Sequence, residues 1–436
     1  MKASRYNFIL ESDETGYLIY NGLSGGFAKI SYKEYEIYKK IIEGKWVGDQ
    51  KNLIKEFRKG FFIIPDEFDE LGYLRVMANI RRFQTNNLSL TIAPTLDCNF
   101  ACIYCFEEKS KRYMSKKVEK ETLEFVEKRL PTVSSLSIAW YGGEPLLVIN
   151  TIEDISENLI SKSEDLGVKY RAYIVTNGYL LTKKVAEKLR DLSVYGAQIT
   201  IDGPRNIHNK RRPLRNGKGT FDTIFENFMA SVDILDNIAI RVNIDKTNRK
   251  YIPKLIDFFK ERGLEKIAII YFSPVRKLTH ICESAVGCYE EQKEFSKEEI
   301  ELYRYLDKKG FKIPIFPKPL YGFCGAIQLN SFLIGPEGNL YKCWNTIGMK
   351  DKIIGNVSEG ITYPHRFIDW LKWDQFAGKE CLKCEVLPIC MRGCPYTGMT
   401  TGVECESWKY NLSEMLKLYY KNKMRTFPNR REENVD

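Results

Sequence analysis

The chain from residue 88 onward alternates short apolar runs with longer stretches in which apolar residues recur every three or four positions. This alternation predicts strand–helix units, whose parallel strands are joined by right-handed crossovers. The expected strands are residues 88–93, 137–141, 171–175, 197–201, 238–244 and 267–272. Six units are too few for a closed eight-stranded barrel, so the pattern predicts an α/β fold built on a partial (β/α)6 barrel.

The first 85 residues form a separate predicted module. Strands are expected at residues 6–10, 17–20, 28–31 and 60–65, and helices from just after Ser31 to Ile42 and at 52–57. Ser31 precedes the first helix, where a hydroxyl can cap free backbone N–H groups. Three strands, two helices and a returning strand in this order predict a winged-helix-like unit. No nucleic-acid partner is expected, because no predicted helix carries a dense Lys/Arg face with groove-reading polar side chains.

The C-terminal third carries a predicted hairpin, with strands at 327–334 and 340–344 around the turn Pro336-Glu337-Gly338-Asn339. These changes in the pattern of predicted strands, helices and cysteines divide the chain into three expected domains. These are residues 1–85, residues 86–290 with the partial barrel, and residues 291–436, which hold a bridging segment and a cysteine-rich region.

The amino-acid composition narrows the class of protein and its partners. The 436 residues are 44% hydrophobic and 28% charged, as in an ordinary globular protein. No apolar run approaches the roughly 20 residues that span a bilayer, and the N-terminus has no secretory apolar core, so we expect a cytoplasmic protein without a membrane partner. The net charge of +10 favours an acidic partner or reflects a solvated lysine-rich surface.

Twelve cysteines change the picture most. None precedes Cys98, three lie within residues 98–105, and seven lie between Cys324 and Cys405. Because the cytosol keeps thiols reduced, grouped cysteines in such a protein indicate metal binding more than disulfides.

The first group is Cys98-Asn99-Phe100-Ala101-Cys102-Ile103-Tyr104-Cys105, directly after the first barrel strand. Three close thiolates suit a soft metal centre, and a 4Fe–4S cluster would need four. Three thiolates therefore leave one iron without a protein ligand. A zinc knuckle or a set of buried thiols is the simpler alternative.

This spacing, with an aromatic residue before Cys105, resembles the signature of the radical S-adenosylmethionine (SAM) enzymes. The resemblance implies that Cys98, Cys102 and Cys105 hold a 4Fe–4S cluster whose open iron binds S-adenosyl-L-methionine. Reductive cleavage then yields a 5′-deoxyadenosyl radical that abstracts hydrogen from a substrate. An electron donor such as flavodoxin or ferredoxin is implied as a partner.

Polar residues follow the later strand ends, which share one face of a parallel sheet where ligands bind. The resemblance implies that the Gly142-Gly143-Glu144-Pro145 turn holds the methionine amino group, with Glu144 compensating its charge. Hydroxyl, amide and carboxylate groups suited to the ribose or adenine follow the third and fourth strands, and Arg241 on the fifth is expected to pair with the methionine carboxylate. Simpler alternatives are that Asn177 caps a turn and Arg241 is a surface residue. The expected SAM contacts are Gly142, Gly143, Glu144, Thr176, Asn177, Thr200, Asp202, Arg241 and Asn243.

The seven C-terminal cysteines resemble the SPASM domain of peptide-modifying radical SAM enzymes, which carries two auxiliary 4Fe–4S clusters. The resemblance assigns Cys381, Cys384, Cys390 and Cys405 to a far cluster, and Cys324, Cys343 and Cys394 to a near cluster. The chain would then hold three 4Fe–4S clusters. Zinc on the Cys-x2-Cys-like sets is the alternative. The near cluster lacks a fourth nearby cysteine; Cys282 or Cys288 supplies it, or the iron stays open.

Together these features resemble a ribosomal-peptide maturase of the sactipeptide or ranthipeptide type. The N-terminal module resembles the recognition element that binds the precursor's leader peptide as an added strand. Thioether formation from a peptide cysteine is the first expectation, and carbon–carbon cross-linking is the close rival. An anaerobic sulfatase (formylglycine) maturase is a second reading; its family carries aspartate where this chain has Trp344, and lacks the N-terminal module. The hypothesis without catalysis is a zinc-bound adaptor that binds peptides.

Overall fold

A nine-stranded sheet organises the computed structural model, which describes residues 1–12, 16–45, 47–322 and 324–426. Its strand order is β11-β10-β9-β8-β7-β6-β12-β13-β14. The six predicted barrel strands are present, pair in parallel and lie in sequential order. They are β6 (Asn87–Ile92), β7 (Ser135–Trp140), β8 (Lys169–Val175), β9 (Val194–Thr200), β10 (Asn237–Ile244) and β11 (Ile269–Pro274). The mixed α/β fold with a parallel-strand sheet is confirmed.

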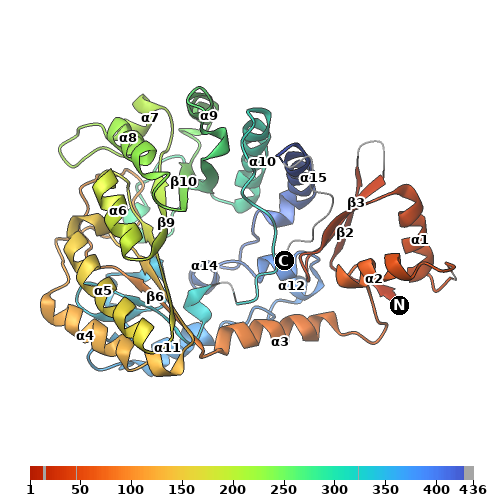
Figure 1. The fold of residues 1–436 in the computed structure, drawn as a ribbon, viewed down its shortest axis with the longest axis horizontal. Helices are drawn as coiled ribbons and strands as arrows, with labels where there is room; N and C mark the ends of the chain where they lie inside the picture. Colours follow the sequence, from red (N-terminus) through yellow and green to blue (C-terminus); the bar gives the residue numbers. More distant parts are fainter. Residues whose placement is uncertain (13–15, 46, 323, 427–436) are drawn as a thin grey trace.

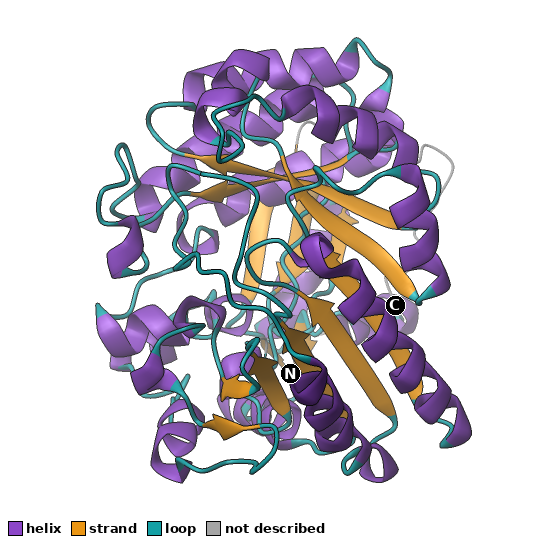
Figure 2. Ribbon diagram, turned by 90° about the vertical axis from the view of Figure 1, so that its left-hand side faces the viewer, coloured by secondary structure: helices purple, strands orange, loops and turns teal. Residues whose placement is uncertain are grey.

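Helices separate these strands and flank the sheet (Figure 2). Local signals start several of them: the Ser115 and Thr182 hydroxyls accept from the backbone N–H groups three residues later. Alternate residues of β7 are buried, with Leu136, Ile138 and Trp140 inside the core. The helices are α4 (Lys116–Glu127), α5 (Ile149–Asp165), α6 (Lys183–Asp191), α7 (Arg205–Arg211), α8 (Phe221–Ser231), α9 (Ile252–Lys260) and α10 (Gln292–Lys308).

The predicted C-terminal hairpin is also present, as β12 (Ser331–Ile334) and β13 (Asn339–Tyr341), paired antiparallel. Gly338 at its turn has φ +78°, a left-handed conformation that favours glycine. The sequence did not predict that β12 pairs in parallel with β6, with Ile334 opposite Ile92. The short strand β14 (Gly355–Asn356) adds to the outer side of β13. The cysteine-rich region is thus continuous with the barrel sheet.

The N-terminal residues form a three-stranded antiparallel sheet of β2 (Asn7–Ser12), β3 (Gly16–Asn21) and β4 (Phe27–Ile30). Two predicted helices follow, α1 (Tyr32–Ile42) and α2 (Lys51–Lys59), and Ser31 and Glu34 form a capping box at the start of α1. The expected returning strand is only β5 (Ile63–Ile64), and it pairs with β1 (Lys2–Ala3) rather than with the three-stranded sheet. The sequence analysis also missed α3 (Glu70–Phe83).

The long helix α3 runs along the lower side of the molecule and links the N-terminal module, at the right, to the barrel, at the left (Figure 1). Near its end the buried Arg82 donates to the carbonyls of Leu371 and Trp373, at 2.8 and 2.9 Å. The C-terminal helices are α11 (Pro364–Leu371), α12 (Lys379–Lys383), α13 (Leu387–Cys390), α14 (Pro395–Thr400) and α15 (Trp408–Thr426). Among the described helices, none is both long enough and apolar enough to cross a membrane.

Candidate active site and cysteine groups

The cysteine loop lies directly after β6, and a second segment of the chain fixes its backbone. The N–H of Ala101 donates to the carbonyl of Pro213 at 2.8 Å, and the N–H of Ile103 donates to that of Arg211 at 3.1 Å. Cys98 is buried, and Cys102 and Cys105 are half-buried. The loop that follows α7 therefore holds the three thiols at the strand end.

Burial dominates the protonation of two of these thiols. Burial, with the Glu144 carboxylate nearby, raises the pKa of Cys98 to about 12. Burial raises the pKa of Cys105 to about 11, and Glu107 adds to the effect. The Phe100 N–H points at the Cys98 sulfur, at 3.4 Å. Without a metal these two cysteines are protonated at neutral pH, whereas a bound metal deprotonates its thiols and would be stabilised by such N–H groups.

The Gly-Gly-Glu-Pro turn after β7 presses against the start of this loop. The N–H groups of Gly143 and Glu144 donate to the carbonyls of Thr95 and Asp97, at 3.1 and 2.8 Å. A Cβ on Gly143 would stand 2.2 Å from the carbonyl oxygen of Asp97, so this position excludes every side chain. The close backbone approach expected of the turn is made here to the cysteine loop.

Glu144 is fully buried and joins the ends of two strands. Its carboxylate accepts from the Thr176 hydroxyl and the Asn177 N–H, both at 2.7 Å, and from the Leu146 N–H at 3.0 Å. Burial raises the pKa of Glu144, and these hydrogen bonds oppose the rise. Glu144 is thus a buried link between the expected cofactor-binding turns.

Asn177 continues this link to the cysteine loop. Its side-chain amide donates to the side-chain carbonyl of Asn99 at 2.7 Å and lies 3.9 Å from the Cys98 sulfur. Its own carbonyl accepts from the Tyr179 N–H at 2.9 Å, so Asn177 also caps the turn. The turn-capping role expected of Asn177 is therefore present, and its contact with SAM stays a prediction.

The fourth and fifth strand ends meet around Tyr104, which the sequence analysis did not include as a site residue. The Tyr104 hydroxyl bonds to the Asp202 carboxylate and accepts from the Asn243 amide at 3.1 Å. The other oxygen of Asp202 accepts from the Asn243 N–H at 2.9 Å. Thr200 is buried at the end of β9, opposite Arg241 in the sheet. The aromatic residue in the motif thus joins the cysteine loop to β9 and β10.

Arg241 is already engaged by its neighbours. Its guanidinium donates to the side chains of Asn243 at 2.8 Å and Ser273 at 2.7 Å. These bonds orient it across β10 and β11, and they leave further guanidinium donors for a carboxylate.

Two more arginines, Arg211 and Arg212, are buried beside the cysteine loop. Arg212 donates to the Tyr104 hydroxyl at 2.8 Å, and Arg211 donates to Asp245 at 2.6 Å. The Nε atoms of both lie buried without a hydrogen-bond partner. Arg211 is ion-paired with Asp202 and Asp245, as a buried cation requires, and the remaining guanidinium donors suit a further anionic group. The sequence offered no signal for them beyond the run of three basic residues Lys210-Arg211-Arg212 after the Asp202-Gly203-Pro204 turn.

The structure brings together the three cysteines expected in the near group. Cys324, Cys343 and Cys394 pack around Ala326, Trp370 and Tyr396. The pKa of Cys343 is raised, chiefly by burial and then by the neighbouring thiols of Cys324 and Cys394. Cys394 follows the far-group cysteines Cys381, Cys384 and Cys390 in the sequence, yet in the fold it packs with the near group.

The four far-group cysteines also gather. Burial raises the pKa of Cys390 to about 11; the N–H groups of Glu406 and Gly393 point at its sulfur, and the Cys405 thiol lies nearby. The pKa of Cys381 is raised, first by burial, with contributions from the thiols of Cys405 and Cys384. Cys384 and Cys390 share a core cluster with Tyr20 of β3. This group therefore lies against the N-terminal module.

Cys282 and Cys288 lie on the loop after β11. The buried Cys282 contacts the Thr279 carbonyl at 3.2 Å, and the Thr279 hydroxyl donates to the Phe106 carbonyl at 2.8 Å. Burial, then the thiols of Cys343, Cys282 and Cys394, raise the pKa of Tyr396. Cys282 thus lies between the cysteine loop and the near group.

The donor chemistry of the three groups fits iron–sulfur clusters. Among the described residues, no three Cys, His, Asp or Glu side chains lie close enough to share one metal ion. In a 4Fe–4S cluster each thiolate binds a different iron, so its ligands stand farther apart than those around a single zinc ion. Backbone N–H groups directed at the sulfurs are typical partners of such ligands.

Comparison with known proteins agrees with this geometry. Residues 92–259 match the family model of the Radical SAM superfamily. The chain is 23% identical to the radical SAM cyclopropyl synthase TigE of Paramaledivibacter caminithermalis, over 90% of this chain and 89% of that protein. It is 25% identical to a cysteine-type anaerobic sulfatase-maturating enzyme of Clostridium novyi, over 74% of this chain and 94% of that protein.

A solved structure, native anSMEcpe with bound AdoMet and Cp18Cys peptide, shares the fold with a TM-score of 0.63 at 20% identity. It aligns with 77% of this chain and 99% of its own. The matched family segment contains all three cysteines of the loop and every expected SAM contact.

Proposed function

We propose that this protein, whose residues 92–259 form a radical SAM domain, is a peptide maturase that installs an oxidative cross-link in a ribosomally made precursor peptide. One observation carries the proposal. Three thiols at the end of β6 meet the Gly142–Pro145 turn and the Asn177 turn, and two further cysteine groups lie within the same fold. The arrangement suits a radical initiator beside separate redox centres.

Each part of the chain has a proposed role. Residues 1–85 recognise the leader peptide, residues 86–290 form the partial barrel that binds SAM, and residues 291–436 hold the auxiliary clusters. Strands β2 and β4 are the outer strands of the N-terminal sheet, and an extended peptide can pair with such an edge. The pairing of β12 with β6 supports a fixed position of the cluster region relative to the barrel.

Cofactor binding follows from the donor sets. Cys98, Cys102 and Cys105 would hold the SAM-binding 4Fe–4S cluster, and the far and near groups would hold two auxiliary clusters. When bound, the first cluster and SAM supply the 5′-deoxyadenosyl radical. Glu144 and Asn177 shape the cofactor turn, while Asp202, Arg241 and Asn243 present polar groups from the neighbouring strand ends.

A thioether from a peptide cysteine is the first proposed product. Joining a C–H carbon to a thiol sulfur removes two electrons and two protons from the peptide, and hydrogen abstraction accounts for only one electron and one proton. The second electron needs an acceptor, which the auxiliary groups are suited to hold. The near group has three gathered cysteines. Unless Cys282 or Cys288 supplies the fourth ligand, one iron of its cluster stays open for a peptide thiolate.

A carbon–carbon bond is the second candidate product. The similarity to TigE, a cyclopropyl synthase, supports it, because the alignment extends over most of both chains. That alignment also favours peptide cross-linking over sulfatase maturation, since the sulfatase-maturating enzyme matches only 74% of this chain. Trp344 stands where the sulfatase maturases carry their aspartate, and its ring packs against that of Tyr141 at a tilt of 33°, with centroids 4.3 Å apart.

Anaerobic purification tests the proposal. A brown protein with about twelve irons per chain is expected for three four-iron clusters, and it should release 5′-deoxyadenosine with a reductant such as flavodoxin. Replacing Cys98, Cys102 and Cys105 with Ala should abolish that product and leave leader-peptide binding intact. A colourless zinc protein would instead support a peptide-binding adaptor. Mass spectrometry of a co-expressed precursor should show the loss of two hydrogens per cross-link. Because oxidation of Ser to formylglycine also removes two hydrogens, labelling with a hydrazide, which reacts with an aldehyde and not with a cross-link, distinguishes the two products.

A further inference from the structure

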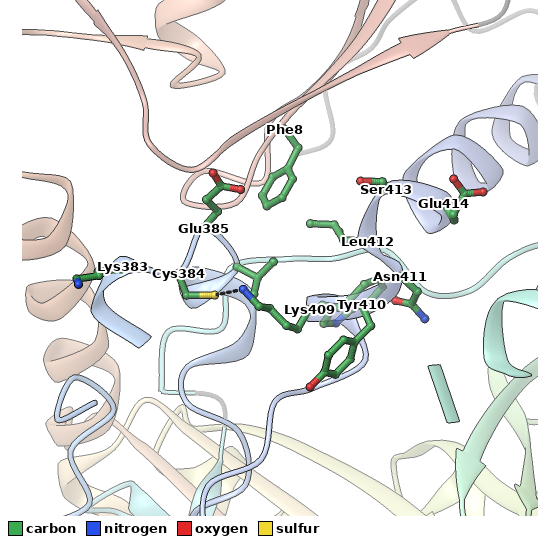
Figure 3. A pocket seen from close by; sticks show the side chains of 12 residues that line it. Phe8, Lys383, Cys384, Glu385, Lys409, Tyr410, Asn411, Leu412, Ser413 and Glu414 are labelled. Carbon is green, nitrogen blue, oxygen red and sulfur yellow. Dashed lines mark hydrogen bonds between the residues drawn. The ribbon is translucent and has the colours of Figure 1, made fainter. Parts of the chain in front are cut away.

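A polar pocket of about 390 Å³ opens beside the far cysteine group (Figure 3). Its wall includes Phe8 of β2, Cys384 after α12, and the first turns of α15. Within it the ammonium of Lys409 lies 3.3 Å from the sulfur of Cys384, the interaction drawn as a dashed line. A cation thus donates directly to a thiol of the far group.

The fold directs Lys409 to this sulfur. Lys409 is the second residue of α15, and the preceding Trp408 packs in the core cluster that contains Cys384 and Cys390. Glu414, one of the two carboxylates that line the pocket, forms an ion pair with Arg304, at 2.5 Å. Lys409 is an exposed residue, and its ammonium reaches the partly buried Cys384.

We propose that Lys409 sets the reduction potential of the far auxiliary cluster, an inference that rests on the proposed cluster assignment. Hydrogen bonds to cluster sulfurs and nearby positive charge stabilise the reduced cluster, which carries one more negative charge, and so make its potential more positive. Lys409 supplies both effects at one sulfur. Arg392, another cation near the group, instead donates to the carbonyl of Asp374, at 2.7 Å.

A more positive far cluster gives electron flow a direction. The near group is enclosed by Trp370, Tyr396 and Ala326, whereas the pocket opens the far group to solvent. An electron taken from the peptide at the near group moves to the far group when the far potential is higher. Lys409 therefore favours movement of the electron towards the surface, where an external acceptor can take it.

The test is a redox titration of the reconstituted full-length protein followed by electron paramagnetic resonance. In Lys409→Met, one midpoint potential should become more negative by about 59 mV, a tenfold change in a one-electron equilibrium. Lys409→Arg, which keeps charge and donors, should remain near the wild-type value. Lys417→Met, an exposed lysine on the same helix, should leave every potential unchanged.

Unchanged potentials in Lys409→Met with full iron content would overturn the proposal. Loss of about four irons in Lys409→Met, with Lys409→Arg no better, would assign the lysine to cluster assembly and also overturn it. Both results differ from failure of the proposed function, because the wild-type protein would then lack auxiliary iron before any variant is compared.

Discussion

The buried carboxylate of Glu144 accepts a 2.7 Å hydrogen bond from the backbone N–H of Asn177, so two successive strand ends share one carboxylate. Asn177 in turn reaches Asn99 in the cysteine loop at 2.7 Å. The turns after β7 and β8 are therefore connected to the cysteine loop through Glu144 and Asn177, and a change at Glu144 should alter the position of the cysteines.

Replacing Glu144 with Gln tests this centre. An amide offers one acceptor oxygen to three donors and directs an N–H group at one of them, leaving a buried donor unsatisfied at a cost of about 1–3 kcal/mol. We expect a lower thermal-unfolding midpoint and at least a tenfold loss of 5′-deoxyadenosine formation. Glu157→Gln, on the exposed side of α5, is the matched control and should change neither measurement. A Glu144→Gln protein with wild-type turnover would remove Glu144 from the network.

Gly143→Ala tests the contact between the turn and the cysteine loop. The new Cβ would meet the Asp97 carbonyl at 2.2 Å, so backbone must move where both neighbours are fixed. We expect loss of 5′-deoxyadenosine formation and about 1–3 kcal/mol of destabilisation. Gly22→Ala meets nothing closer than 3.7 Å and should behave as wild type. Comparable activity of the two variants would show that the turn can separate from the loop.

Tyr104→Phe removes the hydroxyl that joins Asp202, Arg212 and Asn243. Because these partners are buried, we expect a loss of about 1–3 kcal/mol in stability and weaker SAM binding. Tyr305→Phe, whose hydroxyl lies 2.9 Å from Asp257, should lower stability slightly and leave SAM affinity unchanged. Calorimetric titration with SAM gives the affinity. Equal affinities in the two variants would limit Tyr104 to packing.

Cys394→Ser tests whether Cys394 belongs to the near group. Cys394 packs with Cys324 and Cys343, although its loop carries the far group. Its variant should therefore lose the same paramagnetic signal as Cys324→Ser, with about four irons fewer per chain. Cys390→Ser should lose the other auxiliary signal. If Cys394→Ser instead lost the same signal as Cys390→Ser, Cys394 would belong to the far group.

Glu299, at the contact between α10 and α15, makes stability depend on pH. Burial raises its pKa from 4.5 to about 7, against hydrogen bonds from Asn411 and Ser407 that lower it. The folded state therefore holds a proton that the unfolded state releases, and stability falls as pH rises from about 4.5 to about 7, by about 3 kcal/mol at most. Glu299→Gln should match wild type near pH 5 and unfold at a higher temperature at pH 8. The exposed Glu301→Gln should follow wild type at both pH values.

The sequence by itself determined the features that depend on neighbouring residues. The six barrel strands follow from short apolar runs, and Ser31 caps its helix because the hydroxyl and the receiving N–H lie three residues apart. The cysteine spacing placed three thiols in one loop for the same local reason. The special residues were expected at one face because parallel strand ends meet there, and the bonds among Glu144, Asn177 and Asn99 confirm it.

Only the tertiary structure decided what depends on contacts between distant segments. The pairing of β12 with β6 joins residues more than 240 positions apart. Arg211 and Arg212 look like ordinary surface residues in the sequence, yet folding buries them beside the cysteine loop. The Lys409–Cys384 contact likewise exists because α15 packs against the loop of the far group. Hydrophobic periodicity specifies which face of an element is buried, but the partner it meets is selected by the packing of the whole chain.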